Sequence, residues 1–241
     1  NRGLCYDFQF DFDRPAGLAM LSTLIAVASV ALAAPPQVSF QSLLSEMTDR
    51  AAIALYPAPA YLCAQASSYD RASTSPSNAE TWFANGDYNQ FIRVEENNGR
   101  KEWVMMDQAG PGAVVRIWTP NPKGTLRVYV DGADTPVIAA PMAQLLDGTT
   151  LFGAKNANQP LAAELSRGWN LFVPIPFAKR CVITTDDGAG VYYQVDWRSY
   201  GEGVTVDAYD PTAIARFTGF APPERELYAR ARPRPAEIVA G

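Results

Sequence analysis

Arg116 and Trp118 are the two side chains whose types and spacing point most directly to a chemistry. They lie in residues 113–118, an apolar, valine-rich run after a Gly-Pro-Gly turn, so a β-strand is predicted there. Alternation places Val114, Arg116 and Trp118 on one face and the other three residues on the opposite face. A guanidinium that donates to hydroxyl groups, beside an indole that covers C–H groups, suits a sugar. The alternative, which the spacing alone favours, is a half-exposed strand with one solvated arginine.

A second polar row is predicted in the strand 191–198. Three polar residues, Gln194, Asp196 and Arg198, alternate there with tyrosine, valine and tryptophan. One face of this strand is therefore polar and the other apolar. The functional interpretation is that Gln194 and Asp196 lie at the edge of a sugar pocket. The alternative is a sheet with one wet face, in which Asp196 and Arg198 are simply solvated.

The third group of candidates lies in residues 66–89. This segment is rich in Ser, Asn and Asp and is predicted to be a long loop, and long loops in compact domains often carry function. Its aromatic rings would stack on a sugar and its charged groups would satisfy hydroxyls. The candidate residues are Tyr69, Asp70, Arg71, Trp82 and Asp87. A turn held by Asx hydrogen bonds explains the Asn-Gly-Asp of 85–87 equally well.

The sequence contains no histidine. This excludes a Ser-His-Asp or Cys-His nucleophile and any His-ligated zinc or iron site. Asp186-Asp187-Gly188 lacks the alternating spacing of a calcium loop and is predicted to be a turn. Any chemistry must therefore use carboxylates, tyrosine or arginine, and no metal site is predicted.

Two further questions stay open at this point. One idea is that Asp107 or Asp131 forms a local acid–base couple with Asp196. The sequence fits other positions better, because Asp107 is predicted at the end of a strand and Asp131 in a hairpin turn. Cys63 and Cys181 would form a disulfide or remain two small buried thiols, and their spacing does not decide between these.

The elements that would position these residues are mostly strands. One helix is predicted over residues 39–54, with Ser39 as its N-cap, and it ends before Pro57. Strands are predicted over 102–107, 113–118, 125–130, 170–176, 181–185, 191–198 and 204–209. Short strands separated by Gly and Pro, with little helix between them, imply antiparallel pairing. The predicted fold is mainly β, an antiparallel β-sandwich of jelly-roll type with one N-terminal helix.

The beginning of the sequence differs from its middle. Residues 21–33 form an apolar run that ends in Ala31-Leu32-Ala33, which is typical of a signal-peptide cleavage site. The run is too short for a membrane anchor. Residues 1–33 are therefore interpreted as upstream residues and a signal peptide, and the protein is expected to be secreted or periplasmic.

The remaining residues are divided into three parts. An N-terminal helix is predicted within 34–60, a jelly-roll β-sandwich over 61–220, and a proline- and arginine-rich linker or truncated end over 221–241. The net charge of −5 gives no electrostatic reason to bind nucleic acid or anionic lipid. Neither a nucleic-acid partner nor a membrane is expected.

Several short motifs occur in a recognisable order along the chain. They are 43–50 (LLSEMTDR), 67–71 (SSYDR), 82–87 (WFANGD), 101–118, 166–170 (SRGWN), 174–177 (PIPF) and 192–196 (YYQVD). In this order the sequence resembles the family once known as domain of unknown function 2961, now glycoside hydrolase family 172. The resemblance extends over about residues 39–209.

This resemblance implies a fold and an activity. Members of the family are jelly-roll enzymes that assemble into trimers or larger rings and cleave or rearrange furanoside linkages with retention, fructofuranose and arabinofuranose being known substrate types. Retaining cleavage uses two neighbouring carboxyl groups, one as nucleophile and one as acid and then base. The implied partners are a carbohydrate substrate and further copies of the chain, and no cofactor is implied.

The sequence departs from the family pattern at the catalytic glutamates. The family carries them in Trp-Gly-Glu-Gly-Asp and Gly-Thr-Glu-Asp-Tyr segments, and the second segment does not occur here. Gly201-Glu202-Gly203 matches part of the first, but Glu202 follows the predicted strand directly and is expected to be a turn residue. No catalytic residue is therefore assigned, and the chain is expected to be an N-terminal fragment whose glutamates lie beyond residue 241. The alternative is a non-catalytic carbohydrate-binding or interaction β-sandwich.

Overall fold

The structure, a computed structural model, describes residues 36–157 and 161–217, all of which belong to the compact unit Pro35–Gly241. The predicted signal peptide and the predicted linker over 221–241 lie outside the described residues. Within the described part of the chain, no helix is long and apolar enough to cross a membrane.

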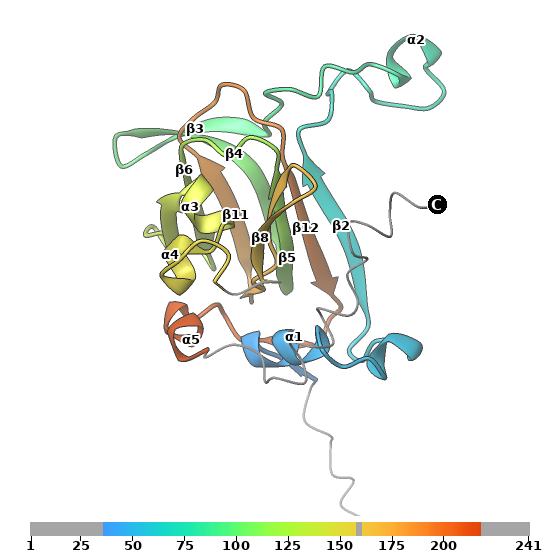
Figure 1. Cartoon of the computed structure of the whole chain (residues 1–241). Helices are drawn as coiled ribbons and strands as arrows, with labels where there is room; N and C mark the ends of the chain where they lie inside the picture. Colours follow the sequence, from blue (N-terminus) through green and yellow to red (C-terminus); the bar gives the residue numbers. More distant parts are fainter. Residues whose placement is uncertain (1–35, 158–160, 218–241) are drawn as a thin grey trace, which may run out of the picture. The chain divides into compact units, whose positions relative to one another are not determined.

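Two antiparallel sheets form most of the described chain (Figure 1). The six-stranded sheet has the order β2 (Tyr61–Ser67), β12 (Gln194–Tyr200), β5 (Gly112–Thr119), β9 (Gly168–Leu171) and β8 (Ala162–Leu165), with β10 (Ile175–Phe177) also paired to β5. The five-stranded sheet has the order β3 (Arg93–Asn97), β4 (Arg100–Ala109), β11 (Arg180–Thr185), β6 (Thr125–Val130) and β7 (Ile138–Pro141). The connections from β4 to β5 and from β11 to β12 pass from one sheet to the other.

One hydrophobic core joins the two sheets. Met106 and Ile183 of the five-stranded sheet belong to the same buried cluster as Ile117 and Val195 of the six-stranded sheet. Each of these side chains is at most 1% exposed. The burial follows from alternation along the strands, since one face of each sheet is apolar and the other largely polar. The predicted antiparallel β-sandwich is confirmed.

Short helices and a small parallel pair complete the described chain. Helix α3 (Met142–Leu146) packs against β6 and β7 of one sheet and β8 and β9 of the other. Further elements are α2 (Ala79–Trp82), α4 (Thr149–Phe152), α5 (Pro211–Arg216) and the parallel pair β1 (Gln37–Val38) and β13 (Thr205–Val206). Besides the predicted N-terminal helix, the described residues therefore contain four further short α-helices.

The predicted N-terminal helix is shorter than expected. Helix α1 (Phe40–Glu46) begins at the predicted N-cap, since Ser39 and Ser42 form a reciprocal capping box. It ends at Met47 instead of continuing to residue 54, where only a 3₁₀ turn (Ala52–Ala54) is found. The Asp49 side chain accepts hydrogen bonds from the backbone of the two residues after Arg50 and so offers the backbone an alternative to the helix.

Several predicted strand boundaries were also wrong. The predicted strand 170–176 is two strands, β9 and β10, and the chain leaves the sheet before Pro174. The predicted strand 204–209 contains only the short β13. Strands β1, β2, β3, β7 and β8 were not predicted at all.

The face assignment of β5 was partly wrong. Asp196 pairs with Arg116 but Trp197 pairs with Val114, so Val115 is an extra residue that forms a β-bulge. The bulge turns Val114 into the core, where it is 1% exposed, and leaves Arg116 and Trp118 on the outer face. In β12 the prediction is confirmed, because its apolar residues are buried and its polar residues face outward.

The two cysteines that the structure describes are both free thiols. Cys63 on β2 is exposed, and Cys181 on β11 is buried in the core. They lie in different sheets, and no disulfide joins them. Burial raises the pKa of the Cys181 thiol, so this side chain acts as a small apolar core residue.

Candidate functional site

Arg116 is the centre of a polar cluster on the outer face of the six-stranded sheet. Its Nε donates to Asn170 Oδ1 at 3.1 Å, and its Nη1 donates to Gln194 Oε1 at 3.0 Å and to Asp196 Oδ2 at 3.1 Å. The three partners come from β9 and β12, the two strands that flank β5. The guanidinium is thus fixed by neighbours on both sides, while its side chain keeps 27% exposure to solvent. It can still meet a ligand at the surface.

Trp118 lies beside this cluster. The guanidinium carbon of Arg116 lies 5.9 Å from the centre of the Trp118 ring. On the other side, Gly168 allows close approach of the indole, since a Cβ there would lie 2.1 Å from Trp118 Nε1. The ring is half-buried, so part of it is available for contact. A charged donor and an aromatic surface therefore lie next to each other, as the sequence predicted.

The Asp196 carboxylate accepts hydrogen bonds from Gln65 as well as from Arg116. Its Oδ1 accepts from Gln65 Nε2 at 2.7 Å, and its Oδ2 accepts from Arg116. Both carboxylate oxygens therefore have a donor, although the side chain remains 26% exposed. An ion pair exposed to this degree contributes little to stability. A ligand hydroxyl can replace one of these donors at small cost, and this suits Asp196 to binding more than to nucleophilic attack.

The predicted loop follows β2 and contains α2, and Figure 1 shows it extending away from the sheets. Asp70 accepts from the backbone N–H of Ala72 at 2.9 Å and of Gly86 at 2.7 Å. These two bonds lower the pKa of the Asp70 carboxyl. Asp87 accepts from the backbone N–H of Asp70 at 3.1 Å. Both aspartates therefore connect the two sides of the loop. The local Asx hydrogen bond is the one from Ala72 to Asp70, and not one within 85–87, where the alternative interpretation predicted it.

The base of this loop lies directly after the end of β2. Arg71 donates to the backbone oxygen of Ser67 at 2.9 Å, and Ser67 is the register partner of Gln194. The Arg71 guanidinium also lies 4.0 Å from the centre of the Tyr69 ring, which is 50% exposed. Trp82 belongs to α2 and is 40% exposed. The structure thus places Arg71 and Tyr69 at the end of β2, beside the buried Tyr193 and without a contact to the Arg116 cluster among the described residues. Trp82 belongs to the extended part of the loop.

Two members of the cluster were not predicted as site residues. Asn170 is 5% exposed and donates to the Gly168 backbone oxygen at 3.0 Å, which fixes its amide towards Arg116. Its position at the end of the Ser-Arg-Gly-Trp-Asn motif was the available signal. Gln65 lies on β2, a strand without clear alternation, and only its pairing with Asp196 identifies it.

The alternative acid–base couples do not form. Asp107 lies in the five-stranded sheet, where Arg180 donates to both of its oxygens at 2.7 Å. Asp131 is in a turn and accepts from the backbone N–H groups of residues 178–180. Neither is therefore a partner for Asp196. Glu202 lies in an exposed turn, as predicted.

No group of three or more His, Cys, Asp or Glu side chains that would hold a metal ion occurs among residues 36–157 and 161–217. Two cavities lie elsewhere on the described chain. One of about 550 Å³ is lined by residues that include Leu55, Tyr56 and Tyr61 at the start of β2, and one of about 300 Å³ lies beside β3 and β6. Neither is lined by the predicted sugar-contacting residues.

Comparison with protein families gives a match. The model of the GH172 first beta-sandwich domain matches residues 59–216, which is more than half of the chain. The matched segment begins just before β2, ends with α5, and contains every candidate site residue discussed above. No curated protein matches the sequence.

Proposed function

The chain belongs to glycoside hydrolase family 172 through its first β-sandwich domain, and from this premise we propose that it serves in an exported retaining hydrolase of furanoside linkages. Fructofuranosides and arabinofuranosides are the proposed substrates. The observation that carries the proposal is the Arg116 cluster beside Trp118, because a fixed fork of donors next to an aromatic ring suits a polyhydroxylated ring.

In this proposal the sandwich supplies a wall of the substrate site. Arg116 and Gln194 hold sugar hydroxyls, Trp118 covers the C–H face of the ring, and Asp196 accepts from a hydroxyl. Tyr69, beside the same strand ends, offers a second aromatic surface. All of these groups are at least partly accessible at the sheet surface.

The two catalytic carboxyl groups are proposed to come from outside the matched sandwich. Retaining cleavage needs a free nucleophilic carboxylate close to an acid. In the described cluster both oxygens of Asp196 accept hydrogen bonds, and Glu202 lies in an exposed turn. The family segment Gly-Thr-Glu-Asp-Tyr does not occur in the sequence. The sandwich would therefore bind substrate, and the chemistry would take place on other residues of the enzyme.

Binding to the chain itself tests this proposal. Calorimetric titration with methyl α-D-arabinofuranoside and with difructose anhydride should show weak binding, and Arg116→Ala or Trp118→Ala should weaken it about tenfold, since each removes roughly 1–2 kcal/mol of contact. Arg50→Ala, which removes an exposed arginine far along the sequence from the cluster, is the control. Unchanged affinity in both cluster variants would refute the role assigned to this face.

A second candidate function is a non-catalytic carbohydrate-binding or interaction module. It is favoured by the fact that Asp196 is fully engaged by Arg116 and Gln65. Product analysis by NMR separates the two candidates. Release of a furanose with retained anomeric configuration supports the hydrolase, whereas binding without turnover by the protein that carries this sandwich supports the module.

We also propose that the protein assembles with further copies of itself. Strand β2 is an edge strand that pairs only with β12 in the described chain, and Leu62 on it is 76% exposed. Ile53 and Tyr56, just before β2, are 82% and 99% exposed. Apolar surface of this kind is typical of contact regions. Light scattering on the purified chain, with Tyr56→Ser as the variant, measures the assembly.

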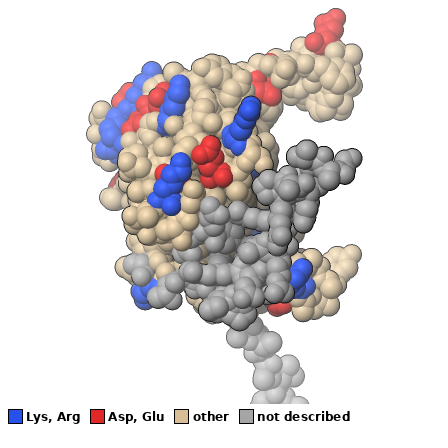
Figure 2. All heavy atoms as spheres, in the orientation of Figure 1, with Lys and Arg blue, Asp and Glu red and all other residues tan. Residues whose placement is uncertain are grey.

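Export and the choice of partners complete the proposal. The apolar run 21–33 on which export rests lies outside the described residues, and mass spectrometry of secreted protein would test cleavage before Ala34. Basic and acidic side chains lie interspersed on the face seen in Figure 2, without an extended patch of one sign. This supports the expectation that neither nucleic acid nor an anionic membrane is a partner.

A further inference from the structure

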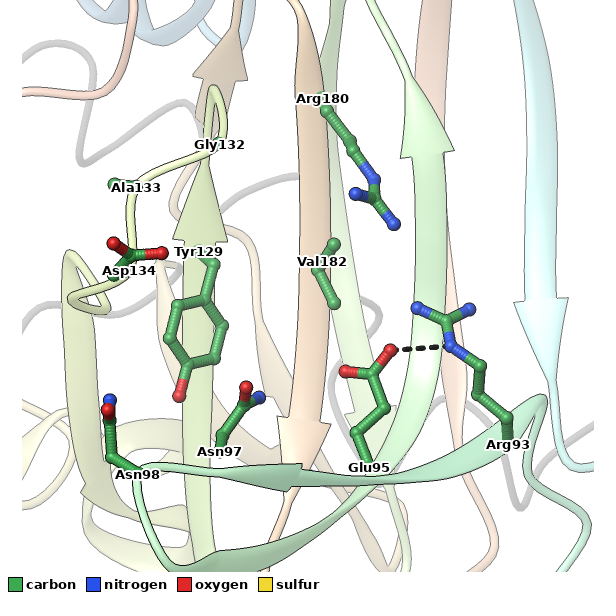
Figure 3. A pocket seen from close by; sticks show the side chains of 10 residues that line it. All are labelled: Arg93, Glu95, Asn97, Asn98, Tyr129, Gly132, Ala133, Asp134, Arg180 and Val182. Atoms are coloured by element: carbon green, nitrogen blue, oxygen red, sulfur yellow. Dashed lines mark hydrogen bonds and ion pairs between the residues drawn. The ribbon is translucent and has the colours of Figure 1, made fainter.

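A cavity of about 300 Å³ lies on the outer face of the five-stranded sheet. Figure 3 shows Tyr129 of β6 and Val182 of β11 on the sheet, with β3 running below them and directing Asn97 and Glu95 towards the cavity. The turn after β6 carries Asp134 to the other side of the opening. Because the inner faces of both sheets share one core, this cavity and the Arg116 cluster lie on opposite faces of the sandwich.

A buried carboxylate holds the floor of this cavity in place. Glu102 is fully buried and accepts from the Tyr129 hydroxyl at 3.0 Å, from Thr184 Oγ1 at 2.7 Å and from Asn97 Nδ2 at 3.3 Å. Burial alone would raise the pKa of Glu102, but these hydrogen bonds and the charge of Arg127 outweigh burial and lower it. The floor and one wall are thus fixed before a ligand arrives.

The arginines that line the cavity are already neutralised. Arg93 Nη2 and Arg180 Nη2 both lie 2.7 Å from Asp107 Oδ2, and Arg93 Nε donates to Glu95 at 2.6 Å. Two guanidiniums therefore face two carboxylates, and Asp134 adds one more negative charge. Since no positive charge is in surplus, the cavity does not favour an anion such as phosphate.

The groups left for a ligand are mixed donors and acceptors. Within the described chain, the side chains of Asn98 and Asp134 make no hydrogen bond or ion pair, and Glu95 keeps one oxygen that Arg93 does not use. Carboxylates accept only, whereas amides both donate and accept. Neighbouring hydroxyl groups of a sugar match this mixture, because each hydroxyl can donate to a carboxylate and accept from an amide.

We propose that this cavity is a second carbohydrate site, which holds one neutral sugar ring of a glycan through its hydroxyl groups. A volume of about 300 Å³ is at the lower end for small-molecule pockets, roughly 300–1,000 Å³, and this favours a single ring over a chain. The acceptors are Glu95 and Asp134, and the amides of Asn97 and Asn98 complete the set. The site shares no residue with the Arg116 cluster and does not depend on the function proposed for that cluster.

The test uses amide NMR spectra of the isotope-labelled full chain, titrated separately with methyl α-D-arabinofuranoside, D-fructose, inorganic phosphate and methylammonium. One of the two sugars should shift the amides of Asn97, Asn98 and Asp134. Asp134→Ala and Glu95→Gln should each weaken binding about five- to tenfold, which is roughly one hydrogen bond. Asp134 is exposed and Glu95 is half-exposed, so neither change threatens the fold.

The matched control is Glu96→Gln, the same chemical change at the next residue of β3. Glu96 is exposed and does not line the cavity, so binding should be unchanged. Equal weakening by Glu96→Gln, absence of any sugar-dependent shift at the cavity, or tighter binding of phosphate or methylammonium would each overturn the proposal. Arg116→Ala should leave these shifts in place, so that failure here and failure of the proposed function are separate results.

Discussion

Replacement of Glu102 by glutamine tests how the outer face of the five-stranded sheet is stabilised. Glu102 on β4 is fully buried, and its carboxylate lies 3.7 Å from Arg127 Nε and 3.3 Å from Arg100 Nε. It also accepts from the hydroxyls of Tyr129 and Thr184. Glutamine keeps the shape of this side chain but removes the charge and turns one acceptor into a donor.

The expected cost follows from these partners. The hydroxyls of Tyr129 and Thr184 can rotate to accept from the new amide, but Arg127 and Arg100 can only donate and lose a charged acceptor. A hydrogen bond to a charged group is worth about 1.5–3 kcal/mol, and glutamine regains part of this because it is easier to bury. Arg127 keeps its bond to Asp186 at 3.0 Å. We expect Glu102→Gln to lower the free energy of unfolding by about 2–4 kcal/mol at neutral pH.

The pH dependence gives a second measurement on the same variant. The folded pKa of Glu102 is lowered from 4.5, so its contribution is fully present above that pH and is lost as pH falls through the folded pKa. The difference in stability between the native protein and Glu102→Gln should therefore shrink as pH decreases below 4.5. Urea unfolding followed by tryptophan fluorescence measures both proteins across this range.

Glu96→Gln is the control for this experiment as well, because Glu96 is exposed on the adjacent strand β3. It should change the free energy of unfolding by less than about 0.5 kcal/mol. If Glu102→Gln were as stable as this control at neutral pH, or if its deficit did not change with pH, the carboxylate would not hold the network as described.

Two further predictions concern the core. Gly112→Ala should destabilise the fold by about 1–3 kcal/mol in chemical denaturation, since the new Cβ would lie 2.5 Å from Phe177 Cζ, whereas Gly201→Ala, with nothing within 4 Å, should cost much less. In the native protein iodoacetamide should alkylate Cys63 well before Cys181, because Cys63 is exposed and burial raises the pKa of the Cys181 thiol. Peptide mass spectrometry measures both sites, and equal rates would contradict the buried position of Cys181.

The sequence predicted the fold best where one face of a strand is buried. In β12 and the residue before it, the alternation of Tyr193, Val195 and Trp197 with polar residues was visible, because a strand between a core and solvent must separate the two types. The same rule failed in β5, since the bulge at Val115 depends on the register with β12. Nothing in residues 113–118 alone signals an extra residue.

The edge strand and the buried carboxylate were missed for physical reasons of the same kind. Strand β2 is exposed along most of its length, so Tyr61–Ser67 shows no alternation and its pairing with β12 is not encoded locally. Glu102 is a charged residue, and charged residues are almost always exposed unless they are paired. Its partners Tyr129 and Thr184 are 27 and 82 residues away in sequence, so only the sheet order brings them together.

The comparison of Asp196 with Glu102 shows why residue type alone does not locate a binding site. Each is a carboxylate on the outer face of a sheet, and each accepts from an arginine and from at least one other side chain. Asp196 is 26% exposed, so water or a sugar hydroxyl can replace one of its donors at little cost. Glu102 is fully buried, so the loss of a donor would leave charge without compensation, and its role is to hold Tyr129 and Asn97 in position. The first network is therefore suited to contact a ligand directly, and the second to shape a cavity whose ligand meets other residues.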